Sequence, residues 1–220
     1  MKNISGFFSE LLLLLMLIQP AGGQDTLRTY GPRFGIDLAR FVYLFADPVQ
    51  VGAEFSVDVE LFPDIYPVLE AGYINISETG DSYNYASGGT YARLGADYNV
   101  LPVKDRSTHH TITAGGRYGI SAFSHRAEQI MIRNDYWGDH LLDSYSNRLT
   151  GHWIELVGAV KTEVAPNFFL GWSVRYKILL NPEMDDRVTP QLVPGYGRGT
   201  VERGFGFTYQ VLYRIPLLRK

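Results

Sequence analysis

Three side chains near the middle of the chain have the chemical types that nucleophilic hydrolysis needs. Ser144, His152 and Glu155 supply a nucleophile, a base and an orienting carboxylate within one short stretch. Such a set could cleave or transfer a lipid ester. Spacing alone does not establish a triad, because a triad is recognised by its geometry, and a loop serine with a rim histidine is the simpler interpretation. A hydrolase or acyltransferase that modifies membrane lipids therefore remains an alternative.

The segment 135–143, DYWGDHLLD, combines carboxylates with an imidazole. It lacks the residue spacing of a calcium loop or a zinc-binding helix, and we interpret it as a solvated, aromatic contact loop. The glycine-rich segment 195–199 follows a proline instead of a strand and opens no helix, so it is no phosphate loop. Cysteine is absent, which excludes thiolate metal sites and thiol nucleophiles. The sequence predicts no cofactor, no metal site and no enzymatic activity.

Length and charge restrict the class of protein further. The 220 residues suffice for one domain or one all-β barrel. The formal net charge of -3 argues against a nucleic-acid partner, because proteins that bind nucleic acids normally carry a basic face. Residues 1–23 join a short polar start to an apolar run and small residues, the pattern of a cleaved secretory signal peptide. The mature domain is predicted to cover residues 24–220.

The elements that must position these side chains are strands. The stretch 49–61, VQVGAEFSVDVEL, alternates without a fault between apolar and polar residues, as in a strand with two different faces. Similar alternation predicts eight strands: 33–44, 49–61, 67–76, 89–100, 110–121, 152–163, 168–180 and 201–215. An even number of antiparallel strands can close into a barrel without edges. The predicted fold is an all-β, eight-stranded, antiparallel, closed transmembrane barrel.

Strand and loop lengths fit a barrel that crosses a membrane. Transmembrane strands need about 9–11 residues to cross the hydrocarbon at their usual tilt. The long predicted connections are 77–88, 122–151 and 181–200, and the short ones are 62–66, 101–109 and 164–167. The first connection, 45–48, is also short and breaks this alternation. Outer-membrane barrels have short periplasmic turns and longer outer loops, so the long connections are expected to be extracellular.

Alternation leaves two orientations open, because the apolar face could meet lipid or line the cavity of a soluble, lipocalin-like carrier. Glycines favour the first orientation, since those at positions such as Gly52, Gly95 and Gly171 lie on the polar face, where they suit a crowded lumen. An eight-stranded barrel is just wide enough for side chains to fill it. We therefore predict a filled polar interior with paired, structural charges. The predicted network comprises Glu54, Asp58, Glu60, Arg93, Asp97, Arg117, Glu155, Arg175, Lys177 and Arg214, with Asp37, Glu70, Lys161 and Glu163 on the same face.

The predicted loop 122–151 is rich in apolar residues for a segment expected to stand in water. Exposed apolar and aromatic groups usually form a partner surface or a self-packed lid. We predict that this loop, together with loop 181–200, contacts a protein partner. The predicted contact residues are Ile130, Met131, Ile132, Tyr136 and Trp137.

Six stretches carry a likeness to a known family: YARLGADYNVL (91–101), HHTITAGGRYGISAFSH (109–125), HWIEL (152–156), NFFLGWSVRYKI (167–178), PGYG (194–197) and YRIP (213–216). They resemble Bacteroidota envelope proteins that are catalogued as a domain of unknown function and regarded as small outer-membrane barrels. The resemblance lends no catalytic residues. It implies a location in the outer membrane, in contact with its lipids. It also implies an accessory role with other outer-membrane proteins in an assembly complex such as the barrel assembly machinery.

Overall fold

Strands make up nearly all of the chain that the computed structural model describes. The described residues are 29–40, 50–79, 84–101, 110–128, 130–132, 140–142 and 144–219. The predicted signal peptide lies outside them. Among these residues there is no helix long and apolar enough to cross a membrane.

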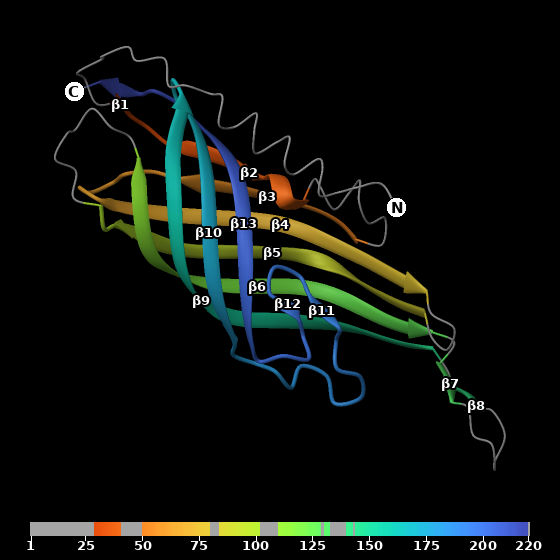
Figure 1. The fold of residues 1–220 in the computed structure, drawn as a ribbon. Coiled ribbons are helices and arrows are strands. Elements are labelled where there is room, and N and C mark those ends of the chain that lie inside the picture. Colours follow the sequence, from red (N-terminus) through yellow and green to blue (C-terminus); the bar gives the residue numbers. More distant parts are fainter. Residues whose placement is uncertain are drawn as a thin grey trace.

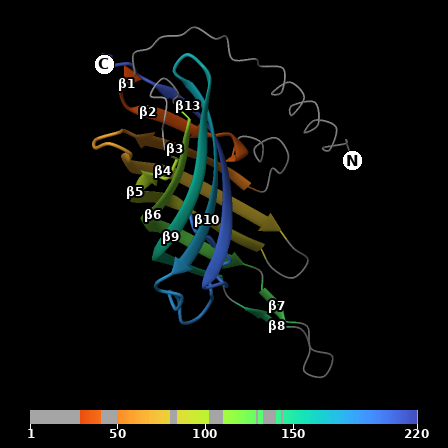
Figure 2. The same cartoon turned by 60° about the vertical axis from the view of Figure 1, so that its left-hand side comes forward.

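Eight strands form a closed antiparallel barrel (Figures 1 and 2). In chain order they are β2 (Arg33–Asp37), β3 (Gln50–Asp58), β4 (Ile65–Thr79), β5 (Asn84–Asn99), β6 (Thr111–Glu128), β9 (Tyr145–Ala165), β10 (Phe168–Leu179) and β13 (Arg203–Arg214). Each strand pairs with its neighbour along the wall, and β2 closes the barrel by pairing with β13. The predicted eight-stranded antiparallel barrel is confirmed.

Three short pairs of strands lie outside the barrel wall. β1 (Thr29–Tyr30) pairs with β14 (Leu218–Arg219), so the described ends of the chain lie together. The other two pairs, at the opposite end, are β7 (Ile130–Ile132) with β8 (His140–Leu142), and β11 (Leu192–Val193) with β12 (Gly197–Arg198).

The two faces of the barrel wall differ in polarity. In β3, Glu54 and Asp58 are 1% and 2% exposed, whereas Phe55 is 56% exposed. The same parity continues along β6 and β9, where buried and exposed positions alternate. The polar face is therefore the lumen, as predicted. This orientation contradicts the lipocalin-like alternative, whose lumen would be apolar.

Four adjacent strands, β4, β5, β6 and β9, extend past the others at the end opposite the short turns, and we call this extension the raised wall (Figure 1). β4 and β5 are separated only by residues 80–83, and β6 and β9 stay paired as far as Ala127↔Tyr145. The long connections predicted at 77–88 and 122–151 are therefore wrong, because much of each segment is strand.

Outward side chains form an apolar belt that ends before the raised wall does. On β6 the belt runs from Ile112 to Ile120, and on β9 from Val160 to Ile154. Roughly nine residues of β6 lie within it, close to the 9–11 that a tilted strand needs to cross hydrocarbon. Above the belt the outward residues of β6 are small or polar: Ala122, Ser124 and Arg126. The apolar alternation stops there, although the backbone hydrogen bonds between the strands continue. The strands predicted from alternation are therefore shorter than the observed ones.

β2 is shorter than predicted, because it ends at Asp37 instead of extending to residue 44. Residues 38–40 form a helical turn, in which the backbone N–H of Ala39 donates to the Asp37 carboxylate (2.9 Å). Aspartate side chains commonly bond the backbone two residues on and favour turns in this way. β13 consequently pairs with β2 only over residues 210–214.

A charge at the centre of the apolar belt tests this orientation. We expect Phe55→Arg to lower the free energy of unfolding by about 2–4 kcal/mol if residue 55 lies near the membrane midplane. Urea unfolding of the protein in lipid vesicles measures the change. The control is Thr150→Arg, at an exposed position on the raised wall, which should have little effect. An unchanged free energy of unfolding in Phe55→Arg would mean that this face does not meet lipid.

Candidate functional site

A cluster of five charged side chains fills the middle of the lumen. Arg175 donates to both carboxylate oxygens of Glu70 (2.6 and 2.8 Å) and to Glu155 (3.1 Å). Arg93 pairs with Glu54 (2.5 Å) and with Glu70 (2.9 Å). β4 and β10, which carry Glu70 and Arg175, are four strands apart in either direction around the barrel. The cluster therefore spans the lumen from one side to the other.

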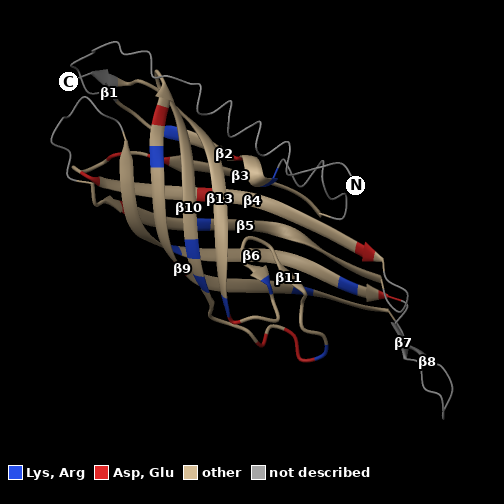
Figure 3. Ribbon diagram, viewed as in Figure 1, with Lys and Arg blue, Asp and Glu red and all other residues tan. Residues whose placement is uncertain are grey.

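A second group of charges lies toward the end with the short turns. Asp58 accepts hydrogen bonds from Arg33 (2.5 Å) and from Lys161 (2.6 Å). Arg117 pairs with Asp97 (2.8 Å), and Lys161 is 3.8 Å from the same aspartate. Acidic and basic positions consequently lie close together on neighbouring strands (Figure 3).

Two predicted members of the network lie nearer the turns. Glu60 follows the end of β3 and accepts the backbone N–H of Asp64 (3.4 Å). Arg214 pairs with Glu163 (3.0 Å) and donates to Asn167 (3.2 Å). Sequence reasoning missed Arg33, because it stands at the very start of a strand where alternation has barely begun.

An apolar layer covers the central cluster on the side of the raised wall. It includes Trp153 and Tyr91 from the wall, with Val193 and Tyr196 from the connection between β10 and β13. Trp153 and Val193 are fully buried. The polar edges of this layer reach the charges below, because Trp153 donates to Glu155 (2.7 Å) and Tyr91 donates to Glu54 (2.5 Å).

The connection between β10 and β13 folds back into the barrel mouth, and we call residues 184–199 the plug. The backbone carbonyls of Gly195 and Tyr196 accept hydrogen bonds from Lys177 (2.7 and 3.0 Å), and that of Leu192 accepts one from Ser87 (3.1 Å). Gly195 has a positive φ of 79°, and a Cβ there would come within 2.5 Å of the Tyr91 ring. Loop 181–200, predicted to contact a partner, therefore buries its residues 193–196 against its own barrel.

Asp185 holds the plug against the raised wall. Its carboxylate accepts hydrogen bonds from Tyr145 (2.8 Å) and Asn147 (3.1 Å) of β9, and lies 2.8 Å from Nε2 of His125 of β6. The backbone N–H of Arg187 also donates to it (3.0 Å). Burial alone would raise the pKa of Asp185, but these hydrogen bonds outweigh burial and hold the pKa well below its usual range.

The residues proposed for nucleophilic hydrolysis are not brought together. His152 is on the outward side of β9, where its Nδ1 lies 2.8 Å from the hydroxyl of Tyr118. Glu155 points the other way, into the lumen. Ser144 is exposed at the start of β9. Neighbouring residues of odd and even number along a strand lie on opposite faces, so this separation follows from the strand itself.

The predicted partner-binding residues fall on the segment between β6 and β9. Ile130, Met131 and Ile132 form strand β7, which pairs with β8. Tyr136 and Trp137 lie outside the described residues, as does most of the candidate metal segment 135–143. In the part of the chain that is described, no group of three or more His, Asp or Glu side chains could hold a metal ion.

Removing one arginine tests the central cluster. Arg175→Met leaves Glu70 and Glu155 buried without their main partner, and breaking a buried pair typically costs about 3–5 kcal/mol. We expect a loss of that size in urea unfolding, partly recovered by Glu70→Gln in the same chain. The control Arg126→Met removes an exposed arginine of the raised wall and should cost less than about 1 kcal/mol. Equal losses at the two arginines would contradict the cluster's structural role.

Asp185→Asn should loosen the plug without opening the barrel. We expect hydrogen exchange in residues 185–199 to rise about tenfold at neutral pH, with exchange in the barrel strands unchanged. The lowered pKa means that this anchor stabilises the fold above the ordinary carboxylate range and is lost as pH falls through the folded value. The wild-type plug should therefore stay protected in mild acid. Asp186→Asn, at an exposed neighbour, is the control, and an equal effect there would refute the anchor.

Comparison with known proteins places the chain in a family. A family model described as "Domain of unknown function (DUF6048)" matches residues 4–220. No curated protein matches the chain. The crystal structure of Acinetobacter baumannii CarO2 is 11% identical, with a TM-score of 0.41 over 86% of this chain and 99% of that one. The crystal structure of Neisserial surface protein A (NspA) is 10% identical, with a TM-score of 0.32 over 88% and 100%. The chain belongs to the DUF6048 family, a domain of unknown function, as its resemblance indicated.

Proposed function

We propose that this protein is an outer-membrane β-barrel that serves as a non-enzymatic interaction subunit of a larger outer-membrane assembly, such as the barrel assembly machinery. Closed barrels are one of the two structures that can cross lipid with their backbone groups satisfied. The apolar belt supports a place in the membrane. The family likeness supports the assembly role.

The observation that carries the proposal is the filled lumen. Buried ion pairs cross the middle of the barrel, and the plug covers them with an apolar layer. A conducting pore needs a continuous water-filled path through the barrel, as in the larger porins. A barrel whose middle is filled by paired side chains in this way has its exterior and its outer end left for function.

The outer end offers a surface for a partner. The outward face of the raised wall is polar above the apolar belt, with exposed residues such as Arg126 and Arg148. The hairpin β7–β8 projects past the ends of β6 and β9, away from the barrel (Figure 1). Partner surfaces commonly combine a polar rim with apolar and aromatic residues, and the sequence of this hairpin supplies Ile130, Met131 and Trp137.

A lipid-modifying enzyme is less well supported than an interaction subunit. Its serine, histidine and carboxylate do not meet in the described residues, because His152 faces outward and Glu155 faces the lumen. The filled barrel also keeps the buried carboxylates in ion pairs, where they are unavailable as bases.

Crosslinking and affinity purification in mild detergent test the proposal. We expect other outer-membrane proteins to copurify with the wild-type chain, and to be lost when residues 129–143 are replaced by a two-residue turn. Heat-modifiable gel mobility checks that the shortened barrel still folds. The control replaces residues 80–83, at the same end of the barrel, with Gly-Ser-Gly-Ser and should retain the partner. A wild-type protein that purifies alone under these conditions would contradict the interaction role.

A further inference from the structure

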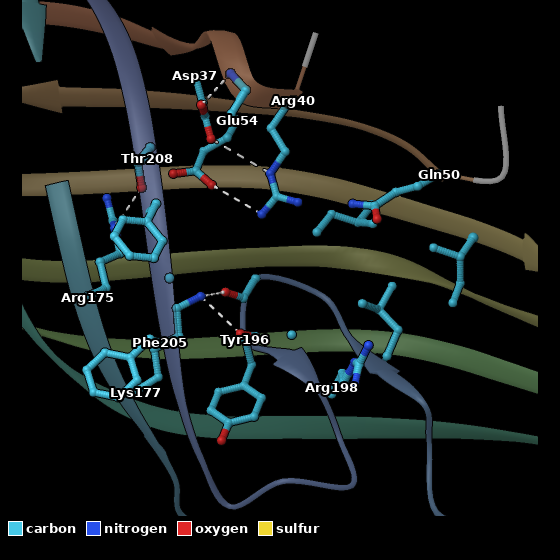
Figure 4. A pocket seen from close by; sticks show the side chains of 18 of the residues that line it. Asp37, Arg40, Gln50, Glu54, Arg175, Lys177, Tyr196, Arg198, Phe205 and Thr208 are labelled. Carbon is cyan, nitrogen blue, oxygen red and sulfur yellow. Dashed lines mark hydrogen bonds and ion pairs between the residues drawn. The ribbon is translucent and has the colours of Figure 1, made fainter. Parts of the chain in front are cut away.

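The barrel wall holds a cavity of about 1000 Å³ in its outer half, between β13 and β3. In the described chain, β2 pairs with β13 only over residues 210–214 and with β3 only over residues 55–58. The next residues of both flanking strands, from Gln50 to Glu54 and from Phe205 to Thr208, supply lining side chains. The cavity therefore lies where β2 leaves the wall, with the plug on its other side (Figure 4).

Two arginines at the cavity have weak or no ion pairs of their own. The Arg40 guanidinium, carried by the helical turn after β2, is 3.8 Å from Asp37 and 3.9 Å from Glu54, at the limit of ion pairing. Arg198 of β12 is exposed and makes no ion pair among the described residues. Lys177 donates to two plug carbonyls, and its Nζ also lies 3.9 Å from a carboxylate oxygen of Glu155. Figure 4 shows these three cations around the cavity.

The lining also includes three carboxylates, Asp37, Glu54 and Glu78, and two further cations. Arg93 and Arg175 also line it, but they are engaged by Glu54, Glu70 and Glu155. One oxygen of Glu54, Oε1, is buried without a hydrogen-bond partner within the described part of the chain. A ligand with a negative charge near Arg40 and Arg198 and a hydrogen-bond donor near this oxygen would give each of these groups a partner.

The cavity also has an apolar side toward the membrane. Phe205 and Phe207 of β13 line it on the membrane side, whereas Ile74, Ile76 and Leu192 line it from the lumen. The two phenylalanines are 74% and 77% exposed. Their register opposite Tyr176 and Val174 of β10 places them on the lipid-facing side of the wall. A polar chamber that is bordered by exposed aromatic residues in the membrane suits a molecule with a charged head and an apolar tail.

We propose that this cavity binds an amphiphile whose headgroup carries a phosphate and a hydroxyl donor, and that the amphiphile enters sideways from the outer half of the membrane. The phosphate lies between Arg40 and Arg198, where charge-assisted hydrogen bonds to guanidinium groups are strong. The hydroxyl donates to Glu54, and the acyl chains leave the cavity past Phe205 and Phe207. This binding site goes beyond the proposed interaction role and does not depend on it.

Native mass spectrometry of the folded full-length protein in a neutral detergent tests the site. The probes are phosphatidylglycerol, which has a net charge and free hydroxyls, and phosphatidylcholine, which has neither. We expect one phosphatidylglycerol per barrel, held at least tenfold more tightly than phosphatidylcholine. Inorganic phosphate in hundredfold excess should not displace it, because free phosphate lacks the apolar contacts. Displacement by phosphate would overturn the amphiphile and its sideways entry, and equal binding of the two lipids would overturn the headgroup assignment.

Two kinds of variant locate the binding. Arg40→Gln with Arg198→Gln should weaken phosphatidylglycerol binding at least tenfold, whereas Arg126→Gln with Arg148→Gln, on the raised wall, should not. Gly206→Leu should fill the cavity, because the atoms nearest to a Cβ at this position are Cε and Nζ at the flexible end of Lys177 (3.0 and 3.4 Å) and Cβ of Arg175 (3.9 Å). Its control is Gly158→Leu, which has nothing within 4 Å on the outward face. Gel mobility verifies folding of each variant. Unchanged binding in folded Gly206→Leu would overturn the proposal.

Discussion

The interaction on which the rest of the structure depends is the ion pair between Glu70 and Arg175 across the lumen. Glu70 receives two hydrogen bonds from Arg175 and an ion pair from Arg93, so one carboxylate connects two guanidinium groups. Charges that leave water are very costly unless they are paired and hydrogen-bonded, and a bidentate arginine satisfies a carboxylate best. Because the partners come from opposite sides of the barrel, their pairing connects the two walls across a lumen whose width eight strands determine.

The apolar layer and the plug above the Glu70–Arg175 pair are attached to the same cluster of charges. The apolar layer can lie directly on a charged one because Trp153 and Tyr91 turn their polar atoms toward the glutamates and their rings toward the plug. Lys177 then ties the plug backbone to the same region, and Asp185 ties it to the raised wall. The plug is thus held by contacts within its own chain, and the described residues expose the apolar belt and the outward face of the raised wall.

The fold was largely predictable because a membrane-spanning barrel displays its geometry in its sequence. In β3 every second residue is apolar and faces outward, so the alternation predicts the strand, and glycine on the polar face predicts which face is the lumen. Alternation does not reveal a strand where the outward face is no longer apolar. Above the belt, residues such as Ser124 are polar, so the strand continues without an apolar signature. At Asp37 a local side-chain bond accompanies the end of β2, three residues before the alternation in the sequence loses its phase.

The candidate sites could likewise be predicted only in part. The charged members of the lumen could be named from parity, but their partners could not, because Glu70 and Arg175 are far apart in sequence and meet only after the barrel closes. The inward fold of the plug was not predicted, since proline and glycine in 190–199 are typical of exposed loops and nothing local shows that the segment turns inward. The cavity at the end of β2 had no sequence signal at all.

Electrical recording from the purified protein in a planar lipid bilayer tests most directly whether the lumen is filled. The ion pairs around Glu70 and the plug leave no continuous aqueous path, so insertion of the wild-type barrel should add no steady conductance in symmetrical salt. Insertion is verified separately by protease protection of the reconstituted protein. A stable, ohmic conductance from the folded wild-type chain would contradict the account, because ions could then pass where the structure places paired charges and packed side chains.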